Sequence, residues 1–178
     1  MTLRILIALF ITNTVFAQQN ALHYELDLSK ENDAFNVTIS NLQLSENDSI
    51  FSFVSYAPGV HQPLDFGRFI KFFKVYDKDG NELITNKIAT NDLLILEPNK
   101  VSKIVYEMDD TFDMNIKDHP IYPMSGTGIT NKYTIVNSHG VFGYFHGLKN
   151  KPIELKIKVN NTPKIGTALN LNDDGVYL

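Results

Sequence analysis

The side chains best suited to metal chemistry are the five histidines of this 178-residue chain. A zinc site of the thermolysin type needs two histidines four residues apart on a helix, with a glutamate directly after the first. Neither feature occurs, because no histidine is followed by glutamate and none has a second histidine four residues on. His139 and His146 are the closest pair, and on a strand their spacing predicts opposite faces. We therefore predict no metal ligands and no cofactor site in this chain.

A second group of candidates is an acidic run that contains Asp109, Asp110, Asp113 and Asp118. The run lacks the alternating oxygen ligands and the central glycine of a calcium-binding loop, so we interpret it as a solvated acidic edge. Ser125 is not preceded, two residues earlier, by the glycine that the Gly-x-Ser-x-Gly elbow of a serine hydrolase requires. We predict no catalytic residue, and a hydrolase with an unrecognised site is the least favoured interpretation.

The first 17 residues have the pattern of a secretory signal peptide. Arg4 is their only charge, residues 5–10 are all apolar, and Val15-Phe16-Ala17 ends in the small residue that a signal peptidase reads. The apolar run is too short for a membrane-spanning helix, which needs about 20 apolar residues. We expect cleavage near Ala17, a mature chain that starts near Gln18, and a secreted or periplasmic protein without a membrane span.

Composition narrows the classes of partner. The formal net charge is −4, and loss of Arg4 with the signal peptide would make the mature chain slightly more acidic. Such a balance argues against nucleic acid or an anionic membrane surface as a partner. The chain has no cysteine, which excludes a disulfide framework.

The elements that must position any functional residue are strands. Apolar and polar residues alternate with a period of two, and no stretch has sustained helical amphipathicity. We predict one all-β domain over residues 18–162, a sandwich or saddle of antiparallel sheets with nine or ten short strands. Residues 109–130 are expected to form a long loop, and residues 163–178 an exit segment. The strands are expected at residues 22–28, 35–39, 50–54, 69–76, 83–84, 93–96, 101–108, 132–136, 141–145 and 153–159, with 93–96 paired to 101–108.

The strand at residues 69–76 differs from the others because both of its faces carry large apolar side chains. Phe73 and Val75 lie on one face, whereas Phe72 and Tyr76 lie on the other. Such a strand is expected to be central in its sheet or to be covered on its second side by something else.

Before that strand, the chain is expected to bend at residues 56–68. Pro58-Gly59 and Pro63 are turn residues, because proline fixes φ and glycine supplies φ > 0. The bend would carry Tyr56, His61, Asp65 and Arg68 outward. The simplest interpretation is a rigid corner that an Asp65–Arg68 ion pair stabilises.

The same bend carries a family resemblance. An aromatic residue two positions before Pro-Gly, followed by Asp-Phe-x-Arg and an Asp-Gly turn, resembles the N-terminal domain of the glycyl aminopeptidase family. This is metallopeptidase family sixty-one, a group of thermolysin-like zinc aminopeptidases. The resemblance extends over nearly the whole mature chain and also rests on Tyr24-Glu25-Leu26-Asp27-Leu28, Gly80-x-x-Leu83, Tyr144 and Gly147 in an aromatic-Tyr-Gly segment, and Pro163 to Leu169.

The resemblance implies a non-catalytic β-domain that packs on a catalytic domain and forms one wall of a peptide cleft. The zinc-binding helix of the family lies in a following domain that is absent from this sequence, so the chain as written is not expected to be an enzyme. By the resemblance, zinc belongs to that missing domain, which would be the partner of this domain together with the peptide substrate. We expect the bend and residues 109–130 to face the missing domain, with Pro58 and Gly59 setting the geometry and Tyr56 and His61 nearest the partner.

One alternative from another class stays open. The chain could be an independent secreted β-sandwich that binds a glycan or a protein through aromatic residues near its bends. The absence of tryptophan weakens a carbohydrate-stacking platform, although the eight tyrosines keep it possible.

Overall fold

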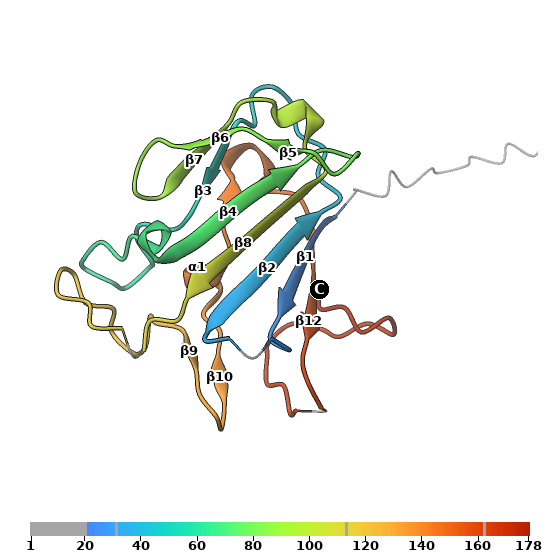
Figure 1. The fold of residues 1–178 in the computed structure, drawn as a ribbon. Coiled ribbons are helices and arrows are strands. Elements are labelled where there is room, and N and C mark those ends of the chain that lie inside the picture. The colour runs from blue at the N-terminus through green and yellow to red at the C-terminus, as the bar shows by residue number, and fades with distance from the viewer. Residues whose placement is uncertain (1–20, 31, 113, 162) are drawn as a thin grey trace, which may run out of the picture.

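The larger of two main sheets contains the first and the last strand of the described chain side by side (Figure 1). The structure is a computed structural model that describes residues 21–30, 32–112, 114–161 and 163–178. The predicted signal peptide therefore lies outside the described residues. The large sheet has the order β12 (Ile153–Lys158), β1 (Leu22–Asp27), β2 (Ala34–Ser40), β8 (Lys103–Asp109), β4 (Ile70–Tyr76) and β5 (Glu82–Leu83).

A smaller sheet packs against the inner face of the large one. Its order is β11 (Tyr144–Phe145), β3 (Ile50–Ser52), β7 (Asp92–Ile95) and β6 (Thr85–Lys87). A separate two-stranded sheet joins β9 (Gly128–Ile129) to β10 (Thr134–Ile135) and projects below the main sheets in Figure 1. The all-β prediction is confirmed, although the described residues form twelve strands. The two strands that were not predicted are β6 and β9, and β9 lies within the predicted loop at residues 109–130.

Two predicted features of the strand pairing are wrong. The sheets are not wholly antiparallel, because β12 runs parallel to β1, with Leu22 opposite Ile153 and Asp27 opposite Lys158. The strands at 93–96 and 101–108 do not pair either, because β7 lies in the small sheet and β8 in the large one. A 3-10 turn at Pro98–Lys100, with proline in its first turn, carries the chain from one sheet to the other.

The strands predicted at residues 132–136 and 141–145 are shorter than expected and belong to different sheets. β10 pairs with β9, whereas β11 pairs with β3. The segment between them forms a single helical turn, α1 (Ser138–Val141), which packs against the 3-10 turn η1 (Phe66–Phe69) at the end of the bend.

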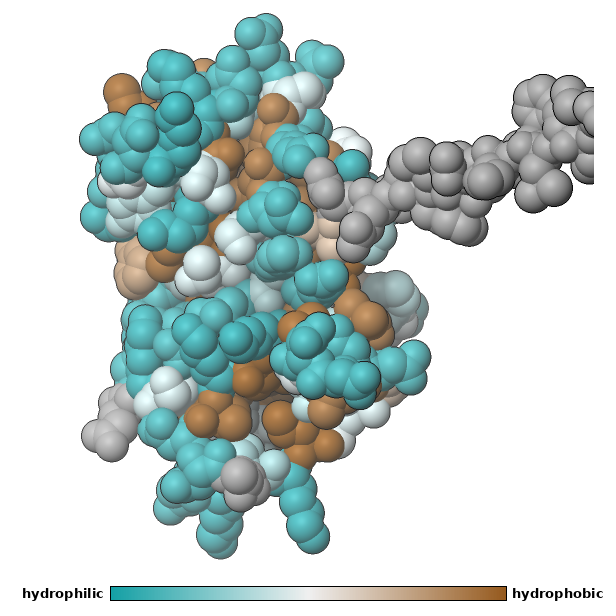
Figure 2. Space-filling model, turned by 90° about the vertical axis from the view of Figure 1, so that its right-hand side faces the viewer, coloured by the Kyte–Doolittle hydropathy of each residue, from teal (hydrophilic) through white to brown (hydrophobic). Residues whose placement is uncertain are grey.

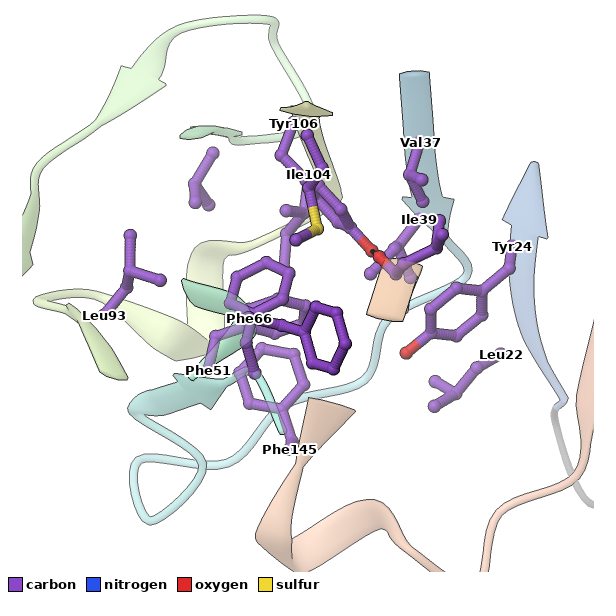
Figure 3. Close-up of a cluster of buried hydrophobic side chains, with 14 of the residues drawn as sticks. Leu22, Tyr24, Val37, Ile39, Phe51, Phe66, Leu93, Ile104, Tyr106 and Phe145 are labelled. Carbon is purple, nitrogen blue, oxygen red and sulfur yellow. Dashed lines mark hydrogen bonds between the residues drawn. The ribbon is translucent and has the colours of Figure 1, made fainter. Parts of the chain in front are cut away.

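The core between the two sheets is rich in aromatic rings (Figure 3). Phe51 of β3 lies at its centre, with ring centroids 5.0 Å from Phe145 and 6.0 Å from Tyr106. Two tyrosines of this core bind backbone carbonyls, since the Tyr24 hydroxyl donates to the Gly143 carbonyl at 2.8 Å and the Tyr106 hydroxyl to the Val141 carbonyl at 3.0 Å. Burial raises the pKa of both phenols above the usual value, so both remain neutral donors.

The strand with two apolar faces is paired on both sides, by β8 and by β5. Val75 is buried in the core, whereas Phe72 lies on the outer face of the large sheet. This outer face is charged, with ion pairs between Lys71 and Asp109 at 2.7 Å and between Glu25 and Lys158 at 2.6 Å. The outer face therefore suits water, although Phe72 is exposed on it.

Residues 163–178, predicted as an exit segment, return to the sheet near the end of the chain. The amide of Tyr177 donates to the Leu155 carbonyl at 2.8 Å, and the Leu155 amide donates back at 2.9 Å. The aromatic ring of Tyr177 is buried against the domain. The boundary at residue 162 stays a prediction. No helix in the described part of the chain is long and apolar enough to span a membrane.

Candidate functional site

The bend begins shortly after β3, and backbone hydrogen bonds join its two ends. The Leu64 amide donates to the Ser55 carbonyl at 2.7 Å, and the Phe66 amide to the Val54 carbonyl at 3.1 Å. Between these bonds the chain turns at Gly59, whose φ of 80° is one that residues with a Cβ rarely adopt. The bend is therefore closed at its base, and its tip projects away from the core.

Asp65 ties the base of the bend to a neighbouring loop. Its carboxylate accepts hydrogen bonds from the Ser55 hydroxyl at 2.6 Å and from the Asn91 side-chain amide at 2.8 Å. Desolvation by itself would raise the pKa of Asp65. The two hydrogen bonds and the charges of Arg68 and His119 outweigh it, and the pKa lies below the usual value. Asp65 is thus held as a carboxylate at neutral pH.

Arg68 reaches the long loop and not Asp65. Its Nη1 donates to the Asp118 carbonyl at 2.6 Å and its Nη2 to the His119 carbonyl at 2.5 Å. The predicted ion pair between Asp65 and Arg68 is wrong, because no ion pair of Arg68 occurs within the described part of the chain. The reason is local geometry. Asp65 has a left-handed backbone (φ 48°) and starts a 3-10 turn that directs the two side chains to different neighbours.

These contacts join two segments that are about fifty residues apart in sequence. Besides the two Arg68 bonds, the Gln62 side-chain amide donates to the Pro120 carbonyl at 2.6 Å. Figure 1 shows the bend and the long loop side by side at one end of the molecule. The two segments that we expected to share a face are therefore adjacent.

The long loop is braced from within near β9. The Asp110 carboxylate accepts from the amides of Phe112 at 2.8 Å and Ile129 at 2.5 Å. The Thr111 hydroxyl accepts from the Thr127 amide at 2.9 Å. The predicted solvated acidic edge is wrong for Asp110, which is buried. Asp109 is partly exposed and pairs with Lys71, and Asp118 is exposed. Asp113 lies outside the described residues.

The two segments expose four apolar or aromatic side chains and a histidine. We call these side chains together the bend–loop surface and define it as Tyr56, His61, Met114, Tyr122 and Met124. Met124 is 88% exposed and Tyr56 63% exposed, while Leu64 and Phe66 at the base of the bend are fully buried. Methionine and tyrosine side chains are adaptable contacts for another protein.

The remaining predicted site residues lie elsewhere. Tyr144 is opposite Ser52 in the small sheet, with the Lys149 ammonium 5.4 Å from its ring centroid. Gly147 lies in the following 3-10 turn (His146–Leu148), where an added Cβ would meet the tip of the Asp48 side chain. Pro58 and Gly59 lie in the turn of the bend.

His139 and His146 contact different neighbours. The Nε2 of His139 is 3.1 Å from the Ser125 carbonyl, and its ring lies against Phe66. His146 instead contacts the ring of Tyr144. In the ranges that the structure describes, no three histidine, aspartate or glutamate side chains are grouped as metal ligands.

Sequence reasoning missed Asn91 and Gln62. Asn91 connects the bend at two points, because its side-chain oxygen also accepts the Gly67 amide at 2.9 Å. The contacts of Asn91 and Gln62 each join the bend to a loop that is distant in sequence. A polar residue in a short turn carries no local signal that would have revealed this role.

The sequence matches the family described as Peptidase M61 N-terminal domain over residues 23–177. The chain belongs to this family. The family is described as the N-terminal domain of a peptidase, and the match accounts for nearly all of the described chain. No curated protein matches the sequence.

A solved structure has a similar fold. It is the crystal structure of an aminopeptidase N family protein from Idiomarina loihiensis, with a TM-score of 0.58 and 15% sequence identity. The match covers 78% of this chain and 22% of that protein, so the M61 N-terminal domain spans about a fifth of the length of the solved chain. At this identity the likeness concerns the fold alone.

Proposed function

We propose that this chain is the non-catalytic N-terminal β-domain of a secreted or periplasmic zinc aminopeptidase of the glycyl aminopeptidase type. In this proposal the domain packs on the catalytic domain through the bend–loop surface and forms part of the wall of the peptide cleft. The observation that carries the proposal is the pinning of the bend onto the long loop by Arg68. This contact holds the exposed apolar side chains of both segments on a base that is braced by hydrogen bonds.

The chemistry of the surface supports a contact role. A patch that contains Tyr56, Tyr122 and Met124 buries apolar area when a second protein covers it. The bonds of Arg68, Gln62 and Asp65 hold the two segments in place before binding, which lowers the entropy that association must overcome. None of these residues forms a nucleophile–base pair, and in this proposal zinc is held by the catalytic domain.

Association with a catalytic domain tests the proposal. The purified chain would be titrated with the separately produced zinc peptidase domain of a longer family member, and binding followed by calorimetry. We expect Met124→Asp to weaken the complex about ten-fold, because it places a charge in a desolvated contact. Ile84→Asp is the matched control, since Ile84 is also exposed but lies beside β5, away from the bend.

Equal binding by both variants, or no binding by the unmodified chain, would contradict this contact role. Hydrolysis of aminoacyl-nitroanilides by the purified chain alone would contradict its non-catalytic character. The activity assay needs no partner, so the two parts of the proposal can fail separately.

A binding module remains the second candidate. The observation that favours it is the exposure of the rings of Tyr56 and Tyr122 on neighbouring segments. Aromatic faces can stack on sugar rings, so a glycan array would test this function. Glycan binding that is lost in Tyr56→Ala, together with no affinity for the peptidase domain, would replace the first proposal by the second.

A further inference from the structure

A groove separate from the bend–loop surface lies beneath the inner face of β1 and β12. It encloses about 1520 Å³ between the β9–β10 hairpin on one side and residues 163–169 on the other. We call it the β12 groove. The groove is open to solvent, and its volume exceeds the roughly 300–1,000 Å³ of sites for small ligands, so it has room for a larger occupant.

The floor of the groove is aliphatic and only half-buried. Leu28, Leu155, Ile157 and Val159 continue the inner face of the sheet, where the small sheet no longer covers it. Phe142 closes one end, with its ring 5.6 Å from that of Tyr24. Figure 2 looks at the molecule from this side and shows hydrophobic surface between hydrophilic ridges in its lower half.

The rim of the groove is positively charged. Its described lining residues include three lysines, Lys30, Lys132 and Lys164, but one carboxylate, Asp33. Lys30 donates to the Asn36 side chain at 2.8 Å and is therefore already bound. Across the ranges with described coordinates, Lys132 and Lys164 form no ion pair, whereas Lys71, Lys74 and Lys158 on the outer sheet face are all paired. On a chain of net charge −4, an unpaired cationic rim favours an acidic occupant.

The walls of the groove offer unpaired backbone. β10 is an edge strand of its two-stranded sheet, with β9 as its partner. Among the residues described at 163–168, no amide or carbonyl forms a backbone–backbone hydrogen bond. Edges of this kind pair with an added extended chain, which supplies matching donors and acceptors. An acyl chain fills the floor but offers no such groups.

We propose that the β12 groove binds an extended polypeptide segment whose apolar side chains alternate with carboxylates. The apolar side chains lie on the floor, the carboxylates face Lys132 and Lys164, and the backbone pairs with a wall. The site is distinct from the bend–loop surface and does not depend on the proposed peptidase partner.

A labelled peptide that alternates leucine with glutamate is the probe, and fluorescence anisotropy of the full chain is the readout. We expect binding in roughly the micromolar range. We expect weaker binding at high salt, because the rim lysines are exposed. A peptide of equal length that alternates leucine with lysine is expected not to bind.

Two matched pairs of variants locate the site. Leu169 lines the groove and is 45% exposed, while Leu171, two residues on, does not line it and is 58% exposed. We expect Leu169→Asp to weaken binding about ten-fold and Leu171→Asp to leave it unchanged. Lys132→Glu is expected to weaken it several-fold, whereas Lys78→Glu, in the turn after β4, is not.

Several outcomes would overturn the inference. One is that the acidic peptide does not bind, and another is that the two variants of a matched pair have equal effects. A third is that oleate displaces the peptide and that Leu169→Asp takes up as much oleate as the unmodified chain. Undiminished binding of a peptide with methylated backbone amides would rule out strand pairing in the groove. Because all these positions are exposed, the circular dichroism of each variant should match that of the unmodified chain.

Discussion

Arg68 and Asp65 are three residues apart, carry opposite charges and still bind different partners. Arg68 binds two neutral carbonyls of the long loop, and its fixed fork of donors spans both of them. Asp65 instead collects hydrogen bonds from Ser55 and Asn91. The two residues therefore stabilise the bend together, one outward to the loop and one inward to the base.

The carboxylate of Asp65 makes stability depend on acid pH. Because its pKa is lower in the folded than in the unfolded chain, its contribution is present above the unfolded value and is lost as pH falls through the folded value. We predict that Asp65→Asn lowers the free energy of unfolding by about 1 kcal/mol at pH 7 and by less at pH 3. Urea denaturation at the two pH values measures the difference.

Asp79→Asn is the control, because Asp79 is an exposed aspartate in the turn after β4. It should change stability little at either pH. A loss in Asp65→Asn that is the same at pH 7 and pH 3 would refute the role given to the charge.

At the scale of elements, the bend depends on two glycines for different reasons. Gly59 has a positive φ but open space around it, whereas an added Cβ at Gly67 would lie 2.3 Å from the Thr90 carbonyl oxygen. Gly59 is needed because its backbone has a positive φ. Gly67 is needed because the η1 turn approaches the loop before β7 so closely that no Cβ fits. Backbone atoms cannot move aside as a flexible side chain can.

We predict that Gly67→Ala destabilises the domain by about 3 kcal/mol, because the backbone of the Thr90–Asn91 loop must shift. Gly59→Ala should lower stability by about 1 kcal/mol, the strain of a left-handed alanine. Chemical denaturation of both variants gives the two values. Equal losses would mean that the approach of η1 to that loop is not tight in solution.

At the scale of the whole molecule, the last residues stabilise the sheet at its open edge. A hairpin over residues 170–178 pairs with itself and, through Tyr177, with Leu155 of β12. Edge strands with unpaired backbone invite pairing with other chains, so this hairpin also protects β12. It borders the β12 groove, which Tyr177 helps to line.

We predict that Tyr177→Ala lowers the free energy of unfolding by about 3 kcal/mol, because a buried ring is replaced by a cavity. Tyr122→Ala, the same substitution at an exposed position of the long loop, should lie within about 0.5 kcal/mol of the unmodified chain. Thermal and urea unfolding provide the comparison. Similar losses in both variants would show that residues 170–178 do not support the sheet.

The sequence by itself determined the class of the domain and the location of its bend. Alternation with a period of two predicted most strands, because each strand buries one face, and Pro58-Gly59 marked the turn. The order of the motifs also indicated the family that the comparison over residues 23–177 shows. These signals are local, or are carried along the chain in order, so the sequence can display them.

The tertiary structure alone decided the partner of Arg68, the parallel pairing of β12 with β1 and the groove beneath them. Each depends on contacts between segments that are far apart in the chain. Periodicity tells which face of a strand is buried but not which strand lies beside it. The floor at Leu155 is half-covered because the small sheet is shorter than the large one and leaves part of its inner face uncovered. The strands could therefore be predicted from the sequence, whereas the groove depends on how the two sheets pack.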